Sequence, residues 1–272
     1  MPKFRLTLSY DGTDFSGSQV QPNRRTVQGE LEVVLGRITP APVRVIFAGR
    51  TDRGVHAVGQ VAAADVPAWS ATAQDLQRAL NAGFPDDLAA REVSPCAASF
   101  NPRFDATWRE YRYWIAPGLV SPFLGRYAWM PRADLDAGAV GAAAERFIGT
   151  HDFASFAGGG EGVPWSERAG RPRGSTRTVF HCGCREISTG NLWRLDEASR
   201  ILEIRVVADG FLPRMVRNIV GALVEAGQGR QTPDWIDELL AARDRRRGST
   251  VAPAQGLTLW RVGYSDDRFE DD

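Results

Sequence analysis

The order in which strand-like and helix-like apolar patterns follow one another constrains the fold of this chain most strongly. In the first hundred residues, apolar positions recur with a period of two in some segments and at helical spacing in others. Thr26 stands where a helix N-cap is expected, and Asp11-Gly12 ends the first alternating run as a turn would. The expected elements form the order β-α-β-β-α-β, with strands over 4–10, 43–48, 58–65 and 88–93 and helices over 27–38 and 72–81.

The second half of the chain repeats this order in outline. Pro213 and Gly227 bracket a strongly apolar segment, an arrangement typical of a helix. The expected elements are strands over 106–115, 201–208 and 257–264, and helices over 135–148, 215–226 and from 232. We therefore predict an α+β protein made of two ferredoxin-like (RRM-like) halves, 1–104 and 105–272, that share a central, mostly antiparallel sheet. Residues 157–175 are rich in Gly, Pro, Ser and Arg and are expected to form a long mobile surface loop.

Composition narrows the class of protein. The 272 residues are 43% hydrophobic, which is ample for a core. No apolar run is long enough to span a membrane, and the N-terminus enters the first strand pattern without a signal region. Three cysteines do not form a disulfide framework, and His181-Cys182-Gly183-Cys184 lacks a second pair of zinc ligands. We expect a cytoplasmic protein without a membrane partner and without a metal.

Acidic and basic residues balance in this chain, but arginine and lysine are used very unequally. Acidic and basic residues number 33 each, so binding of nucleic acid by the whole surface is not expected. Lys3 is the only lysine, and all other basic residues are arginine. Arginine grips phosphate through two parallel hydrogen bonds and stacks on bases. Biased codon usage explains the same excess equally well.

The densest chemical signal lies at residues 48–57, between two expected strands. Gly49 and Gly54 allow a tight turn, which would project Arg50, Asp52 and His56 from the end of a sheet. An aspartate flanked by arginines is expected to be ionised at neutral pH, which suits a nucleophile or a base. The structural alternative is a turn in which the aspartate caps its own backbone.

Two further segments contain side chains suited to binding. Arg217 interrupts the apolar helix after Pro213, and a charge on a buried helix requires a partner. Asp52 is one candidate, while another acid or an exposed position would serve as well. Tyr111 lies on a strand in which aromatic residues and arginine alternate, as they do on sheets that bind RNA. An aromatic core strand is the alternative.

Four motifs follow one another along the chain. They are Ser9-Tyr10-Asp11-Gly12-Thr13, the loop at 48–57, Tyr111-Arg112-Tyr113, and Met215-Val216-Arg217-Asn218-Ile219-Val220-Gly221. Together they resemble the TruA family of tRNA pseudouridine synthases, and the loop at 48–57 looks like the family's signature. Ala254-Gln255-Gly256-Leu257 also resembles the family's closing strand, so the resemblance covers nearly the whole chain.

The resemblance implies a pseudouridine synthase fold and a definite reaction. Asp52 matches the catalytic aspartate, Arg50 an arginine that holds the flipped nucleotide, and Tyr111 the tyrosine packed against the target base. Arg217 matches the arginine that pairs with the aspartate. Family members isomerise uridines at positions 38–40 of the tRNA anticodon arm, need no cofactor, and act as homodimers in which one tRNA contacts both subunits.

Some residues depart from the family pattern. Arg53 stands where a small residue is usual, and Ser18 stands where an aromatic residue is expected between Gly17 and Gln19. The loop at 157–175 is longer than expected.

Two other functions stay open. The first is a non-catalytic RNA-binding protein of tandem RRM-like folds. The second is a small-molecule enzyme that uses Asp52 and His56 as an acid–base pair, although no phosphate loop or nucleotide fingerprint supports it.

Overall fold

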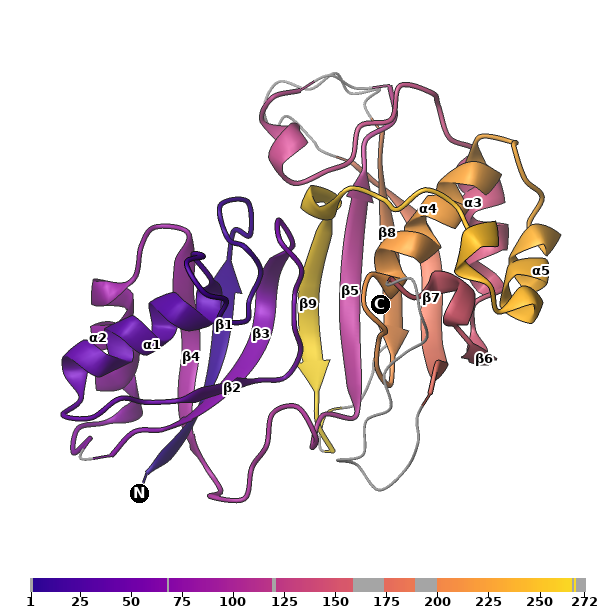
Figure 1. Ribbon diagram of the computed structural model, residues 1–272. Coiled ribbons are helices and arrows are strands. Elements are labelled where there is room, and N and C mark those ends of the chain that lie inside the picture. The colour runs from indigo at the N-terminus through magenta and orange to yellow at the C-terminus, as the bar shows by residue number, and fades with distance from the viewer. Residues whose placement is uncertain are drawn as a thin grey trace. The chain divides into compact units, whose positions relative to one another are not determined.

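The computed structural model describes residues 2–67, 69–118, 121–158, 174–188, 200–265 and 267. The chain forms two compact units, which we describe separately. The first unit contains Met1–Arg109 together with Thr258–Asp272, and the second contains Glu110–Leu257 (Figure 1). The two halves expected at 1–104 and 105–272 are defined by a repeated order of strands and helices, whereas the two compact units are defined by contacts within each unit. The division into halves therefore stays a prediction.

The first unit is a sheet covered by two helices on one face (Figure 1). Its strands run in the order β4-β1-β3-β9, and β2 pairs with β3. All these pairings are antiparallel except the short parallel contact between β3 and β9. The elements are β1 (Lys3–Tyr10), α1 (Val27–Ile38), β2 (Val45–Phe47), β3 (His56–Asp65), α2 (Ala73–Gly83), β4 (Leu88–Cys96) and β9 (Leu257–Gly263).

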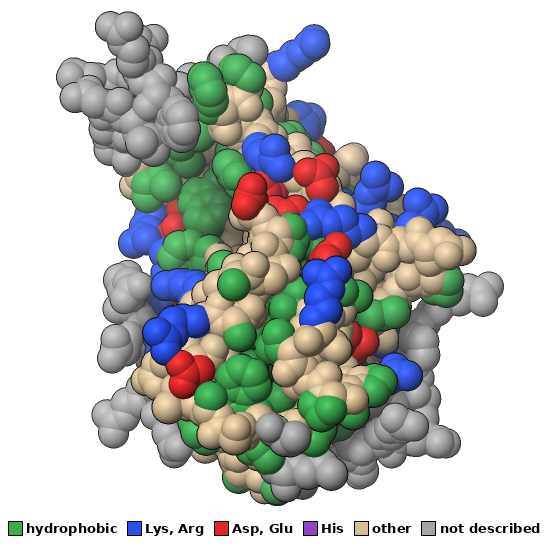
Figure 2. Space-filling view, turned by 90° about the vertical axis from the view of Figure 1, so that its left-hand side faces the viewer, with side chains coloured by type: hydrophobic (Ala, Val, Ile, Leu, Met, Phe, Trp, Pro, Cys, Tyr) green, Lys and Arg blue, Asp and Glu red, His purple; other side chains and the backbone are tan. Residues whose placement is uncertain are grey.

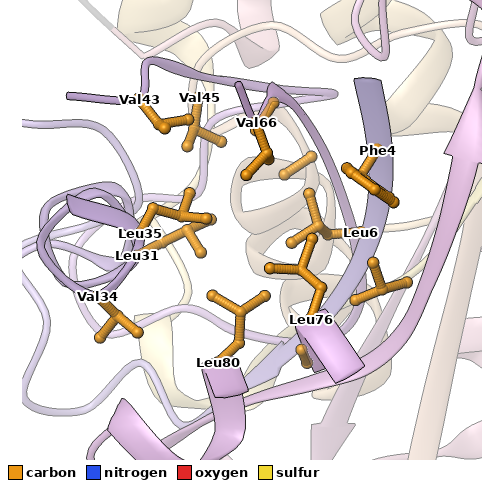
Figure 3. Packing of buried hydrophobic residues seen from close by; sticks show 14 of the residues in the cluster. Phe4, Leu6, Leu31, Val34, Leu35, Val43, Val45, Val66, Leu76 and Leu80 are labelled. Carbon is orange, nitrogen blue, oxygen red and sulfur yellow. The ribbon is translucent and has the colours of Figure 1, made fainter. Parts of the chain in front are cut away.

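Local sequence explains why these helices begin where they do. The Thr26 side chain accepts the Gly29 N–H and caps α1. Thr72 and Asp75 exchange hydrogen bonds in a capping box at the start of α2. Both helices then turn their apolar stripes toward alternate residues of β1, which removes the apolar side chains from water. Figure 3 shows this core, with Phe4, Leu6, Leu31, Val34, Leu35, Val43, Val45, Val66, Leu76 and Leu80 labelled.

The described residues of the second unit form four strands and three longer helices. Its strands run in the order β5-β8-β7-β6, and β7 pairs antiparallel with both β6 and β8. The elements are β5 (Trp108–Ile115), α3 (Ala137–Glu145), β6 (Gly149–Asp152), β7 (Thr176–Ser188), β8 (Arg200–Ala208), α4 (Met215–Gly227) and α5 (Asp234–Ala242), with short 3-10 turns at Leu124–Arg126, Ala154–Phe156, Arg245–Arg247 and Ala254–Gly256.

The predicted α+β class with mostly antiparallel pairing is confirmed. Two strands were not predicted, β6 and β7, and β7 contains Cys182 and Cys184. Most of the predicted loop at 157–175 lies outside the described residues, which resume at 174. Within the described residues, no helix combines the length and apolar character needed to cross a membrane.

Candidate functional site

Asp52 lies on the loop between β2 and β3 of the first unit. Arg50, Asp52 and Arg53 are exposed, whereas Thr51 between them is buried. The Val55 N–H donates to the Asp52 carbonyl over 3.1 Å, which closes a tight turn. Gly54 in that turn has a φ of 78°, a conformation that glycine adopts without steric cost. The loop therefore presents its charged side chains to solvent while Thr51 anchors it.

The first anchor of this loop is Ser18. The Ser18 N–H donates to the Thr51 carbonyl over 3.1 Å, and the Thr51 N–H donates to Ser18 Oγ over 2.9 Å. Gly17 allows this close approach, because a Cβ on it would lie 2.9 Å from the Thr51 oxygen. Gly17 also has a φ of 95°, which side-chain-bearing residues rarely adopt. Ser18 thus holds both the N–H and the carbonyl of the buried Thr51.

The second anchor is a buried polar cluster beneath the loop. The hydroxyl groups of Tyr10 and Thr51 lie 2.8 Å apart, and Gln60 Nε2 donates to the Gly49 carbonyl over 2.9 Å and to the Tyr10 hydroxyl over 3.3 Å. Burial raises the pKa of Tyr10 to about 12, so its hydroxyl stays protonated near neutral pH. Gln60 Oε1 is the one buried side-chain acceptor without a hydrogen-bond partner among the described residues. The cluster fixes the loop at Gly49 and at Thr51.

His56 begins β3 on the other side of the loop and is buried. The Gly12 N–H donates to His56 Nδ1 over 3.0 Å, and Asp11 Oδ1 lies 3.2 Å from the same nitrogen. A Cβ on Gly12 would lie 2.0 Å from the Val55 oxygen, so the two backbones are in direct contact. These contacts tie His56 to the 11–12 turn. His56 is thus buried, whereas Asp52 is exposed.

Tyr111 and Arg217 lie in the second unit. Tyr111 is buried on β5, where its ring meets the Phe211 ring edge-on, with 5.0 Å between centroids. Arg217 is half-buried in the first turn of α4 and donates from Nε to the Ala252 carbonyl over 2.7 Å. The Ala252 N–H donates back to the Arg217 carbonyl over 3.1 Å. The Arg217 guanidinium is therefore held at Nε by the segment that precedes β9.

One of the two arginines of β5, Arg112, has a structural role instead of a phosphate-binding one. Arg112 is buried and donates to Glu110 over 2.8 Å and to Glu203 over 3.3 Å. Arg205 also reaches Glu110, over 3.1 Å, and Arg185 reaches Glu203, over 2.7 Å. Burying these charges is tolerable because each carboxylate has two cationic partners. The alternating sequence pattern did not distinguish this network from an RNA-binding surface.

Thiol chemistry receives no support from the structure either. Burial raises the pKa of Cys182 well above its ordinary range and that of Cys184 to about 11, so both stay protonated near neutral pH. Among the described residues, no three His, Cys, Asp or Glu side chains lie together as metal ligands.

Charges of both signs are interspersed on the surface. Figure 2 shows arginine side chains beside acidic ones on the face that it draws. On this face neither sign of charge forms a continuous patch (Figure 2).

Comparison with known proteins gives one consistent result. The sequence model of a family described as tRNA pseudouridine synthase matches residues 7–105 and 143–265. A tRNA pseudouridine synthase A from Solidesulfovibrio magneticus is 44% identical over 273 residues, spanning 97% of this chain and 92% of that protein. Proteins of the same name from Geobacillus kaustophilus and Thermosipho africanus are each 40% identical, spanning 97% and 96% of this chain and 95% and 99% of their own lengths.

Proposed function

Because the chain belongs to the tRNA pseudouridine synthase family, we propose that it isomerises uridine to pseudouridine at positions 38–40 of the tRNA anticodon arm, with Asp52 as the catalytic carboxylate. The observation that most directly supports Asp52 as the catalytic carboxylate is the way its loop is held. An exposed carboxylate stands on a loop that is anchored from below by Thr51 and closed by Gly54. A catalytic group needs such a rigid support to hold it at the reacting atom.

The reaction explains why one carboxylate is enough. The bond between uracil N1 and ribose C1′ breaks, the base turns, and C5 is joined to the same C1′. The C5 proton leaves and N1 takes up a proton, so the product has the same atoms as the substrate. The atoms are rearranged without oxidation, so no cofactor is required. Asp52 either attacks C1′ to form a covalent intermediate or removes a proton from C2′ to give a glycal.

The remaining predicted residues act on the substrate. The target uridine must leave its stack at a cost of about a few kcal/mol. Arg50 is exposed two residues before Asp52 and holds the flipped nucleotide. Tyr111 packs against the target base, and its ring is oriented by Phe211. Arg217 binds the substrate with a guanidinium whose Nε is already fixed by Ala252.

The experiment is pseudouridine mapping of an unmodified tRNA transcript that carries uridines at positions 38–40, without added cofactor. Wild type is expected to convert these uridines, whereas Asp52→Asn is expected to bind the transcript and leave them unchanged. Asp65→Asn is the matched control, because Asp65 is an exposed aspartate at the far end of β3. Binding without conversion by wild type would instead support a non-catalytic RNA-binding protein of tandem RRM-like folds.

The assembly and location that the resemblance implies belong to the same proposal. We infer a cytoplasmic homodimer in which one tRNA contacts both subunits. Light scattering of the purified protein tests the dimer: a mass of twice 29.8 kDa is expected, and a mass of 29.8 kDa at micromolar concentration would contradict it.

A further inference from the structure

Arg214 has a backbone conformation that is unusual for an arginine. It is the N-cap residue of α4, with φ 58° and ψ 8°, and its side chain makes no capping hydrogen bond. For a residue with a Cβ this left-handed conformation costs about 1 kcal/mol or more, and glycine would avoid the cost. Asparagine, aspartate, serine or glycine would be the ordinary choice for an N-cap. Strain of this kind points to a use for the side chain itself.

The Arg214 side chain is guided by its surroundings. Its stem passes directly over Gly158, where an added Cβ would lie 2.6–2.8 Å from Cβ, Cγ and Cδ of Arg214. The Gly158 N–H donates to the Pro213 carbonyl over 2.6 Å, which holds the two backbones together. Arg214 as a whole is exposed. The stem is thus constrained while solvent reaches the residue.

A second arginine, Arg245, lies beside it. Arg245 donates to Asn218 Oδ1 over 2.8 Å and to the Ser249 carbonyl over 3.0 Å. Asn218 is buried, is fixed by its own hydrogen bond to the Phe156 carbonyl over 2.6 Å, and follows Arg214 by four residues on α4. Residues four apart share one face of a helix, so the Arg245 guanidinium lies near Arg214. Burial lowers the pKa of Arg245, and the neighbouring charge of Arg214 lowers it further.

Two carboxylates among the described residues, Asp244 and Asp152, pair with other arginines. Asp244 accepts from Arg246, and Asp152 pairs with Arg243 over 3.4 Å. Among the described residues, the hydrogen-bond partners of Arg245 are neutral oxygens. Two like charges held close together repel each other, and an anion that joins them relieves this repulsion. The positive end of α4, a helix of 13 residues, adds to the attraction.

We propose that Arg214 and Arg245 form a binding site for a backbone phosphate of the RNA substrate, an assignment that rests on the proposed function. Arginine suits this ligand because its planar fork matches two phosphate oxygens. Arg217, assigned to the substrate, follows Arg214 by three residues on the same helix. The bound phosphate therefore belongs to the nucleotides that flank the target uridine.

The experiment measures the affinity of wild type and variants for an unmodified tRNA transcript by fluorescence anisotropy at a series of KCl concentrations. Arg214→Gly is expected to weaken binding about tenfold, because one charge-assisted contact is lost. The slope of log K against log salt should become shallower by about 0.7–0.9, the value for one phosphate. Arg214→Lys should retain much of the slope. Arg132→Gln is the matched control, because Arg132 is an exposed arginine of the same unit, and it should behave as wild type.

A stability readout separates binding from structure. Arg214→Gly should raise the melting temperature, since glycine relieves the left-handed strain, while tRNA affinity falls. Equal affinity and slope for Arg214→Gly and Arg132→Gln would overturn the phosphate site. If inorganic phosphate stabilises wild type but not Arg214→Gly, and tRNA affinity does not change, the site binds free phosphate and the RNA assignment is wrong.

The outcomes for the two proposals differ. Conversion of uridine by wild type, with no effect of Arg214→Gly on binding, overturns this site alone. Failure of wild type to bind tRNA overturns both the site and the proposed function.

Discussion

The anchor between Ser18 and Thr51 leads to a quantitative prediction. Ser18→Ala removes the Oγ that accepts the Thr51 N–H over 2.9 Å. Both residues are buried, with 1% and 6% exposure, so water cannot replace the lost acceptor. An unsatisfied buried donor costs about 1–3 kcal/mol. We expect the free energy of unfolding to fall by about that amount, with the melting temperature lower by about 2–4 °C for each kcal/mol.

The same change should reduce catalysis without weakening tRNA binding. Asp52 follows Thr51 directly, so a loosened anchor widens the range of positions that its carboxylate samples. If 1.4 kcal/mol of the anchoring energy contributes to placing Asp52, kcat falls about tenfold. The KM for tRNA should stay close to that of wild type, because the Ser18 side chain is buried and its hydroxyl already accepts the Thr51 N–H.

Single-turnover conversion of a tRNA transcript, together with urea unfolding, provides the assay. The matched control is Ser94→Ala, because Ser94 is a half-buried serine on the edge strand β4. This change should leave the free energy of unfolding and the activation free energy calculated from kcat within about 0.5 kcal/mol of wild type. If Ser18→Ala loses stability but keeps the kcat of Ser94→Ala, the anchor is structural and does not position Asp52. If Ser18→Ala loses neither, the reasoning about the buried donor is wrong.

Three further perturbations test other parts of the fold. Gly221→Ala would place a Cβ 2.0 Å from the Thr250 oxygen, so α4 must shift; a loss of about 1–3 kcal/mol in urea unfolding is expected, and wild-type stability would refute it. Thr72→Ala removes the N-cap of α2 and should cost about 1 kcal/mol in the same measurement, with no change in kcat. Burial raises the pKa of Tyr10 from 10.0 to about 12, so its contribution to stability is complete below pH 10 and is lost as the pH rises from about 10 to about 12. Unfolding curves between pH 9 and 11.5 should therefore be less steeply pH-dependent for Tyr10→Phe than for wild type, and an unchanged slope would contradict the assignment.

Local patterns were sufficient to predict most elements of the fold. The alternation over 4–10 and the helical spacing over 27–38 correspond to β1 and α1, and Thr26 caps α1 as expected. These features depend on neighbours within a few residues, so periodicity and capping chemistry reveal them. The strand β7 was missed because its polar and apolar residues do not alternate, and its partners β6 and β8 lie elsewhere in the chain.

The sequence by itself determined the class of fold, the loop that presents Asp52, and, through ordered motifs, the family. Only the tertiary structure decided which polar residues support this loop and which neutralise one another. Ser18 departs from the family pattern, yet the sequence does not reveal its bond to Thr51, which joins residues 33 apart. Arg112 looked like a residue for RNA and is instead buried between Glu110 and Glu203. Residue type and spacing reveal local geometry, but the partner of a buried polar group is set by chain segments that meet only on folding, where an unpaired group would cost the most.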